Sequence, residues 1–190
     1  MAIEKLLPLA GPAGTLKWQE TVQTWKKEYP INMSSYNGMT PEKIIRTINE
    51  RYPSAIVATD VGQNQLWTTQ YLDLDENKQL LTSGGLGTMG YGFPAAIGAQ
   101  LGNPDKRVIC ISGDGGMQMN IQEMATAVAL ELPLILCVFN NGYLGNVRQW
   151  QEMFFHKRYS STCMRYRKRC QRDCQNRDKC CPKYTPDFIK

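Results

Sequence analysis

Short runs of hydrophobic residues alternate along the chain with longer segments in which apolar positions recur at helical spacing. Four runs have the length and residue types of buried strands, and they lie at residues 55–59, 79–82, 107–112 and 134–139. The helical segments lie at residues 16–29, 41–51, 93–101 and 117–130, with a shorter one that ends at Tyr71. Strands that alternate with helices predict an α/β fold, a doubly wound parallel sheet with helices on both faces.

Two of the helices have clear end signals. Thr40 suits the N-cap position and Pro41 the first helical position, so a helix should begin there. The sequence Gly-Asn-Pro at residues 102–104 should end the helix at 93–101. Residues 1–14 contain two Pro and two Gly and are expected to be a linker from an upstream domain. The α/β domain itself is expected at residues 15–160.

Candidate chemistry lies where two predicted strands end. Gly113-Asp114-Gly115-Gly116 follows one strand, and Asn140-Asn141 follows the next. The carboxyl ends of parallel strands share one edge of a sheet, where α/β proteins bind ligands. The glycines and the helix start behind them favour an anion such as phosphate, which the Asp114 carboxylate would repel. A divalent cation between the two resolves this conflict, with Asp114 and neutral amide oxygens as hard ligands.

Other interpretations of these motifs remain open from the residues alone. Asn141-Gly142 is also a common turn sequence, so the two ends of the motif could be unrelated turns. Gly85-Leu-Gly-Thr-Met-Gly90 satisfies the dinucleotide fingerprint and, taken alone, would suggest a nicotinamide or flavin site. The acid at about the expected spacing, Asp105, falls in a turn rather than at a strand end, which disfavours that reading.

The formal net charge of +5 comes from one segment of the chain. Ten of the 22 basic residues lie between Lys157 and Lys183, and the rest of the chain has 12 basic and 15 acidic residues. A mildly acidic body is poor evidence for nucleic-acid binding. No apolar run approaches the length of a membrane span, and the N-terminus lacks the apolar core of a signal peptide, so we expect a cytoplasmic protein without a membrane partner.

The cysteines divide into two groups. Cys110 and Cys137 lie in predicted core strands and are expected to be buried as small hydrophobes. The other five share the basic segment, and they are Cys163, Cys170, Cys174, Cys180 and Cys181. Four thiolates could bind zinc or an iron–sulfur cluster, although the typical Cys-x-x-Cys spacing is absent. Redox-sensitive free thiols and disulfides are the alternatives.

The Gly-Asp-Gly and Asn-Asn pair, nearly thirty residues apart, resembles the thiamine diphosphate motif. The flanking blocks at residues 82–100 and 141–152 resemble acetolactate synthase (acetohydroxyacid synthase) catalytic subunits. The resemblance runs from about Trp18 to Tyr159 and resumes at residues 186–190. It implies a thiamine diphosphate- and Mg²⁺-binding domain of an enzyme of branched-chain amino acid biosynthesis. The intact enzyme would decarboxylate pyruvate and join the two-carbon unit to a second 2-oxo acid.

The resemblance also implies a role for individual residues. Asp114, Asn141 and the main-chain carbonyl of Tyr143 would hold Mg²⁺. Gly87 would offer its carbonyl to the aminopyrimidine ring, and Met89 would support the bent cofactor from below. The full set of implied cofactor-binding residues is Val61, Gly62, Gln63, Asn64, Gly87, Met89, Gly113, Gly115, Gly116, Asn141, Tyr143 and Leu144. The residues implied for the substrate channel are Val147 and Trp150.

The chain departs from the family pattern at two of these blocks. Asn64 stands where the family usually has His, and Asn146 stands where it usually has Met. Trp150 favours acetolactate synthase over the runner-up, another thiamine-dependent 2-oxo acid decarboxylase or oxidase. The single histidine, His156, is expected to be a surface residue at the end of a helix.

Parts of the family's active site have no counterpart in this sequence. The activating Glu comes from another domain, so no catalytic residue is assigned and the chain alone is expected to be inactive. FAD would bind the full-length enzyme outside this chain. Residues 161–185 are interpreted as a Cys-rich basic insertion and residues 186–190 as a truncated continuation of the domain. The full-length enzyme would be at least a homodimer, with a regulatory subunit. A non-catalytic redox- or metal-sensing module built on the insertion is the alternative from another functional class.

Overall fold

The computed structural model describes residues 2–9, 14–31, 33, 36–75 and 78–164. The chain divides into two compact units, Met1–Ser34 and Ser35–Lys190. The first unit contains α1 (Ala2–Leu6), a 3-10 turn η1 (Leu7–Leu9) and α2 (Leu16–Glu28). The helix α1 lies within the stretch that we expected to be a linker. The helix α2 has nearly the predicted bounds but groups with the first unit, whereas the sequence placed it in the α/β domain.

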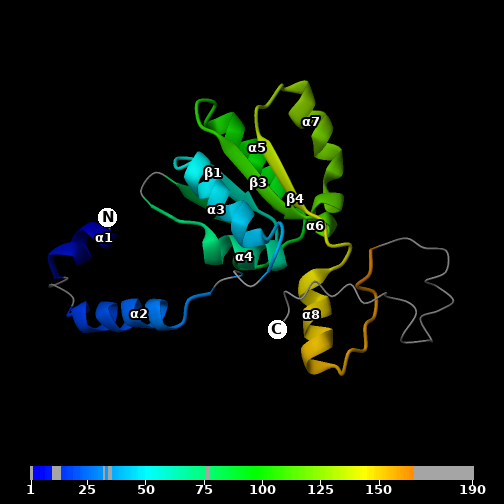
Figure 1. The fold of residues 1–190 in the computed structure, drawn as a ribbon. Helices are drawn as coiled ribbons and strands as arrows, with labels where there is room; N and C mark the ends of the chain where they lie inside the picture. Colours follow the sequence, from blue (N-terminus) through cyan, green and yellow to red (C-terminus); the bar gives the residue numbers. More distant parts are fainter. Residues whose placement is uncertain (1, 10–13, 32, 34–35, 76–77, 165–190) are drawn as a thin grey trace. The chain divides into compact units, whose positions relative to one another are not determined.

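The second unit is built on a four-stranded parallel sheet (Figure 1). Its strands are β1 (Ile56–Thr59), β2 (Gln79–Thr82), β3 (Val108–Gly113) and β4 (Ile135–Phe139), in the order β2-β1-β3-β4. In β1 every residue is buried, as is typical of a central strand in a sheet covered on both faces. Each strand lies within one residue of its predicted start and end.

The strand order explains how helices cover both faces of the sheet. The helices are α3 (Pro41–Arg51), α4 (Gln63–Tyr71), α5 (Gly92–Gly102), α6 (Asp114–Met119), η2 (Ile121–Glu123), α7 (Met124–Ala129) and α8 (Gly145–Phe154). The strand β1 pairs with β2 on one side and β3 on the other, so the direction of the crossovers reverses there. Right-handed crossovers then place α4 and α5 on opposite faces. The predicted doubly wound α/β fold is confirmed.

The hydrophobic core on the α5 side joins that helix to the two central strands. Phe93, Ala96 and Ile97 of α5 pack against Ile56 and further residues of β1 and β3. Cys110 is part of this cluster and is fully buried, whereas Cys137 on β4 is only half-buried. The start of α3 is as predicted, because the Lys43 N–H donates to Thr40 Oγ1 at 3.2 Å.

The prediction of one helix at residues 117–130 is wrong in detail. The chain forms α6, η2 and α7 instead, and the first of these begins at Asp114. The break falls at Asn120, whose φ of −132° is not helical. Its side-chain Nδ2 donates to the Gly90 carbonyl at 2.8 Å, so a tertiary contact competes with continuation of the helix.

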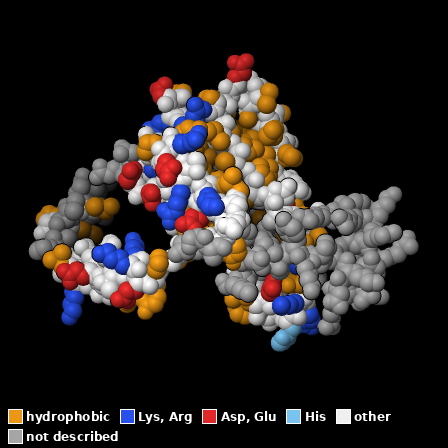
Figure 2. All heavy atoms as spheres, in the orientation of Figure 1, with side chains coloured by type: hydrophobic (Ala, Val, Ile, Leu, Met, Phe, Trp, Pro, Cys, Tyr) orange, Lys and Arg blue, Asp and Glu red, His pale blue; other side chains and the backbone are white. Residues whose placement is uncertain are grey.

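The strand β4 is one of the two outer strands of the described sheet and is less covered than the central strands β1 and β3. Figure 2 shows hydrophobic side chains gathered over the part of the domain that β4 and α7 occupy. The exposed ones include Met124, Val128, Leu130 and Val138. Among the described residues, no helix has the length and apolar character needed to cross a membrane.

Candidate functional site

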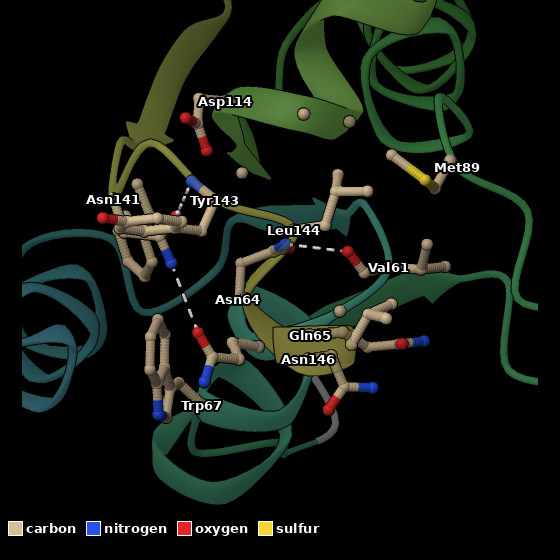
Figure 3. Close-up of a pocket in the computed structure, with 18 of the residues that line it drawn as sticks. Val61, Asn64, Gln65, Trp67, Met89, Asp114, Asn141, Tyr143, Leu144 and Asn146 are labelled. Atoms are coloured by element: carbon tan, nitrogen blue, oxygen red, sulfur yellow. Dashed lines mark hydrogen bonds between the residues drawn. The ribbon is translucent and has the colours of Figure 1, made fainter. Parts of the chain in front are cut away.

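A cavity of about 340 Å³ opens at the carboxyl edge of the sheet, close to the point where the crossovers reverse (Figure 3). All twelve predicted cofactor-binding residues line it, and so does Asp114. Six further lining residues are Gln65, Trp67, Phe139, Gly145, Asn146 and Val147. The structure therefore brings together residues from the ends of β1, β3 and β4 that are far apart in the sequence.

The two halves of the Gly-Asp-Gly and Asn-Asn motif are in direct contact. The Gly142 N–H donates to Asp114 Oδ2 at 2.9 Å, and the Tyr143 N–H donates to Asn141 Oδ1 at 2.9 Å. Gly142 has a φ of +74°, which suits glycine at this turn. The Asn141-Gly142 turn and the Asp114 turn are thus parts of one arrangement, and they are not unrelated turns.

A second set of hydrogen bonds joins the loop after β1 to the loop after β4. Asn141 Nδ2 donates to Gln63 Oε1 at 3.3 Å, and Gln63 Nε2 donates to Gln149 Oε1 on α8 at 3.1 Å. A Cβ added at Gly145 would collide with Gln63 Oε1 and would lie 2.8 Å from Asn141 Nδ2. The absence of a side chain at Gly145 therefore allows these amides to meet.

Asp60 organises the other side of the cavity, a role that the sequence analysis did not assign. It is 1% exposed, and its Oδ1 accepts from the Val61 and Gly90 N–H groups at 2.9 and 3.1 Å. Its Oδ2 accepts from the Gly92 N–H at 2.9 Å. A carboxylate at the end of a buried strand was the available signal, since such a group needs buried donors. Here the donors are the next residue along the chain, the glycine-rich loop and the start of α5.

Glycines next to Asp60 make this close packing possible. A Cβ at Gly92 would lie 2.5 Å from the Asp60 backbone nitrogen, and a Cβ at Gly116 would collide with the Asp60 carboxylate. The start of α5 and the first turn of α6 therefore approach the end of β1 more closely than a residue with a side chain would allow. Of the fingerprint glycines, Gly90 donates to Asp60 and Gly87 lines the cavity.

Asn64 lines the cavity and is only 4% exposed. Its Nδ2 donates to the Val61 carbonyl at 3.0 Å (Figure 3). Its Oδ1 is buried and has no hydrogen-bond partner among the described residues. A buried acceptor without a donor costs about 1–3 kcal/mol, so this oxygen is available to a donor or a cation in the cavity.

The charge of the cavity is carried by one residue. Asp114 is the only Asp, Glu, Lys, Arg or His among the lining residues that the structure describes. An anionic ligand would meet this carboxylate with no basic side chain in the lining to offset it, so a cation is needed between them. The described residues contain no group of three or more His, Cys, Asp or Glu side chains that could hold a metal ion. The predicted ligand set is of another kind, because it combines one carboxylate with an amide oxygen and a main-chain carbonyl.

Apolar side chains meet over Gly115, next to Asp114. A Cβ at Gly115 would lie 3.0 Å from Leu144 Cδ2, 3.1 Å from Met164 Sδ and 3.5 Å from Met89 Cε. Met164 was placed in the Cys-rich insertion by the sequence analysis, which gave no signal for this contact. A backbone hydrogen bond holds Met164 in place, because its N–H donates to the Gly142 carbonyl at 2.9 Å.

The two predicted substrate-channel residues occupy different places. Val147 lines the main cavity, whereas Trp150 lines an adjoining cavity of about 580 Å³ that also includes Val147. Trp150 is 59% exposed and stacks edge-to-face on Phe154 with ring centroids 6.1 Å apart. A surface position for His156 is confirmed, since it is exposed and follows the end of α8.

The described cysteines do not form a metal site. Burial, followed by the nearby Asp60 carboxylate, raises the pKa of the Cys110 thiol to about 12, so this thiol is protonated at neutral pH. Burial also raises the pKa of Cys137. Cys163 is half-buried, and its backbone forms a bridge with Tyr143. The other four cysteines of the basic segment lie outside the described residues.

Comparisons with known proteins point to one family. Residues 60–176 match the family described as "Thiamine pyrophosphate enzyme, C-terminal TPP binding domain". The chain is 43% identical over 154 residues to the acetolactate synthase large subunit of Porphyra purpurea, a match covering 80% of this chain and 26% of the relative. It is 38% identical over 170 residues to the acetolactate synthase isozyme 2 large subunit of Escherichia coli (strain K12), a match covering 85% and 30%. The chain thus spans about a quarter of the relatives' length.

Proposed function

Because the chain belongs to the thiamine pyrophosphate enzyme family, we propose that its α/β domain is the diphosphate- and metal-binding part of an acetolactate synthase large subunit. Thiamine pyrophosphate is the same compound as thiamine diphosphate. The observation that carries the proposal is the contact of Asp114 with the loop at residues 141–143 at the wall of the cavity. One carboxylate, one amide oxygen and one carbonyl then share a small volume.

These groups fit Mg²⁺, which prefers oxygen ligands and brings several of its own waters. Asp114 supplies the negative charge, and its Oδ2 is fixed by the Gly142 N–H. Asn141 Oδ1 accepts from the Tyr143 N–H and retains a second lone pair for a cation. We assign the third ligand to the Tyr143 carbonyl. The cation would neutralise Asp114 and attract the diphosphate, which none of the described lining side chains does by itself.

The remaining lining residues suit the rest of the cofactor. Backbone N–H groups around Gly115 and Gly116 would hold the diphosphate, and the lack of side chains there leaves room for it. Met89 and Leu144 would offer an apolar wall to the cofactor on one side. The Gly87 carbonyl, at a residue with a φ of +63°, would accept from the aminopyrimidine. When bound, thiamine diphosphate supplies the electron sink for carbanion chemistry, and the protein supplies binding and orientation.

The reaction proposed for the whole protein is the decarboxylation of pyruvate and transfer of the two-carbon unit to a second 2-oxo acid. Relatives that match over most of this chain are acetolactate synthase large subunits. Val147 and Trp150 would border the path of the 2-oxo acid, because they line the cavity and its neighbour. The activating Glu, the FAD site, the homodimer contacts and a regulatory subunit belong to the same proposal and concern other parts of the protein.

Binding of Mg²⁺ and thiamine diphosphate tests this proposal directly. Trp67 lines the cavity, so tryptophan fluorescence should change when the pair binds. We expect Asp114→Ala to weaken the Mg²⁺ affinity measured from that change by at least about tenfold, because the one charged ligand of the proposed set is lost. Asp105→Ala is the matched control, since Asp105 is exposed and outside the cavity. Equal Mg²⁺ affinity in both variants would show that the ligand assignment is wrong.

A further inference from the structure

Arg148 is a charged residue with an unusual environment. It lies in α8 and is only 6% exposed. Its guanidinium group contacts the aromatic rings of two tyrosines. Its guanidinium carbon is 3.7 Å from the ring centroid of Tyr159 and 4.4 Å from that of Tyr143. Such distances are well within the range of cation–π contacts, and the planar guanidinium is suited to stacking. Arginine is seldom buried to this degree without a specific role.

The two rings belong to segments on opposite sides of α8 in the sequence. Tyr143 precedes the helix, and its main-chain carbonyl is the third metal ligand of the proposed function. Its side chain is 5% exposed, so the ring is fixed in the interior and with it the backbone that carries the carbonyl. Tyr159 follows the helix and leads into residues 160–164, which we call the return segment.

The return segment runs back to residues 141–144, which we call the metal loop because they include the proposed ligands Asn141 and Tyr143. Hydrogen bonds hold the return segment there. The Leu144 N–H donates to the Thr162 carbonyl at 2.8 Å, and the Met164 N–H donates to the Gly142 carbonyl at 2.9 Å. From the other side, Gln151 of α8 donates to the Ser160 carbonyl at 3.0 Å. Residues 142–144 and the return segment therefore form one unit, with Met164 over Gly115 at the cavity wall.

We propose that Arg148 is a positioning residue for the cation site. Stacked between Tyr143 and Tyr159, it holds the metal-binding carbonyl and the return segment in a single arrangement. Cation binding and docking of the return segment then favour each other, because coupling between two sites is reciprocal. This inference rests on the proposed function, since that function gives Tyr143 its metal.

The expected size of the effect follows from the two stacked contacts. Each contributes about two- to fivefold to an equilibrium constant, so loss of both should weaken Mg²⁺ binding about tenfold. Arg148→Lys should lose most of this effect, because an ammonium group cannot cover two rings at once. Tyr159→Phe keeps the ring and should retain the affinity, whereas Tyr159→Leu should lose about threefold. The pair at Tyr159 leaves the buried arginine in place and so avoids the loss of stability expected for Arg148→Ala.

The experiment uses the full chain with Mg²⁺ and thiamine diphosphate and has two readouts. The first is Mg²⁺ affinity at saturating thiamine diphosphate, from tryptophan fluorescence. The second is the rate at which iodoacetamide alkylates Cys163 on the return segment, resolved from the other cysteines by peptide mass spectrometry. In the unsubstituted chain, Mg²⁺ with thiamine diphosphate should slow alkylation of Cys163. In Arg148→Lys and Tyr159→Leu this protection should largely disappear, and Tyr159→Phe should restore it.

A variant that lowers stability elsewhere distinguishes the positioning role of Arg148 from a purely structural one. Ile45→Val removes a methyl group from a fully buried side chain of α3 and should leave both readouts unchanged. If it weakens Mg²⁺ binding as much as Tyr159→Leu does, the positioning role is refuted. The role is also refuted if binding depends on Asp114 but Arg148→Lys and Tyr159→Leu retain affinity and protection. No Asp114-dependent binding in the unsubstituted chain would overturn the proposed function together with this inference.

Discussion

Replacement of Asp60 by Asn should weaken the domain and disorder one wall of its cavity. The carboxylate accepts three backbone N–H groups, two at Oδ1 and one at Oδ2. Asparagine has almost the same shape but only one acceptor oxygen. If that oxygen keeps Val61 and Gly90, the new NH₂ group faces the Gly92 N–H, and two donors oppose each other in a site that is 1% exposed.

The magnitude follows from the bonds that are lost. A hydrogen bond to a charged group contributes about 1.5–3 kcal/mol, and a buried donor left without an acceptor costs about 1–3 kcal/mol. One bond is removed and the other two lose their charge, so we expect a loss of about 2–4 kcal/mol in the free energy of unfolding. For a chain of this size, this corresponds to a decrease in Tm of roughly 5–15 °C.

Urea unfolding followed by circular dichroism measures this difference. Asp73→Asn is the matched control, because Asp73 is exposed and the same atoms are exchanged there. The control should change the free energy of unfolding by no more than about 0.5 kcal/mol. If Asp60→Asn is as stable as the control, the carboxylate does not hold the glycine-rich loop and the start of α5, and the reasoning fails.

Two further substitutions test the site and the core. Gly145→Ala should lower the Mg²⁺-dependent affinity for thiamine diphosphate about tenfold, because the new methyl group displaces Gln63 from Asn141. Gly98→Ala is the control and should leave this affinity unchanged, because no atom lies within 4 Å of a Cβ at Gly98. Cys110 has its pKa raised from 9.0 to about 12 on folding, so its contribution to stability is present below pH 9 and is lost as the pH rises toward 12. Between about pH 8 and pH 10, the free energy of unfolding should therefore fall by about 1 kcal/mol more in the unsubstituted chain than in Cys110→Ala, as measured by urea unfolding. Equal decreases in the two proteins would contradict this.

Much of the fold could be predicted because its signals are local. The alternation of apolar runs and helical segments determines the strands to within one residue, and the Thr40 cap gives the start of α3. The convergence of Asp114 and Asn141 could be predicted because the carboxyl ends of parallel strands share one edge, and the other cavity residues were implied by the family resemblance. The twelve implied cofactor-binding residues do line one cavity, although their roles stay predictions.

The parts that sequence reasoning missed depend on contacts between distant segments. Asn120 ends a helix because Gly90 lies near it in space, and nothing in the residues around Asn120 predicts that contact. Met164 reaches Gly115 only because the return segment pairs with the metal loop. Asp60 was assigned no role of its own, because two of its three donors, Gly90 and Gly92, lie in segments that no local pattern connects to it. In each case tertiary contacts override the local preference.

The return segment also sets the order in which the site can form during synthesis. A growing chain that stops before Ser160 already contains all four strands, Asp60, Asp114 and Asn141. It still lacks the backbone partners of Leu144 and Gly142 and the sulfur over Gly115. The loop with the proposed metal ligands is therefore held by residues that leave the ribosome after it. The backbone contacts of this loop are therefore complete only once the chain up to Met164 has been synthesised.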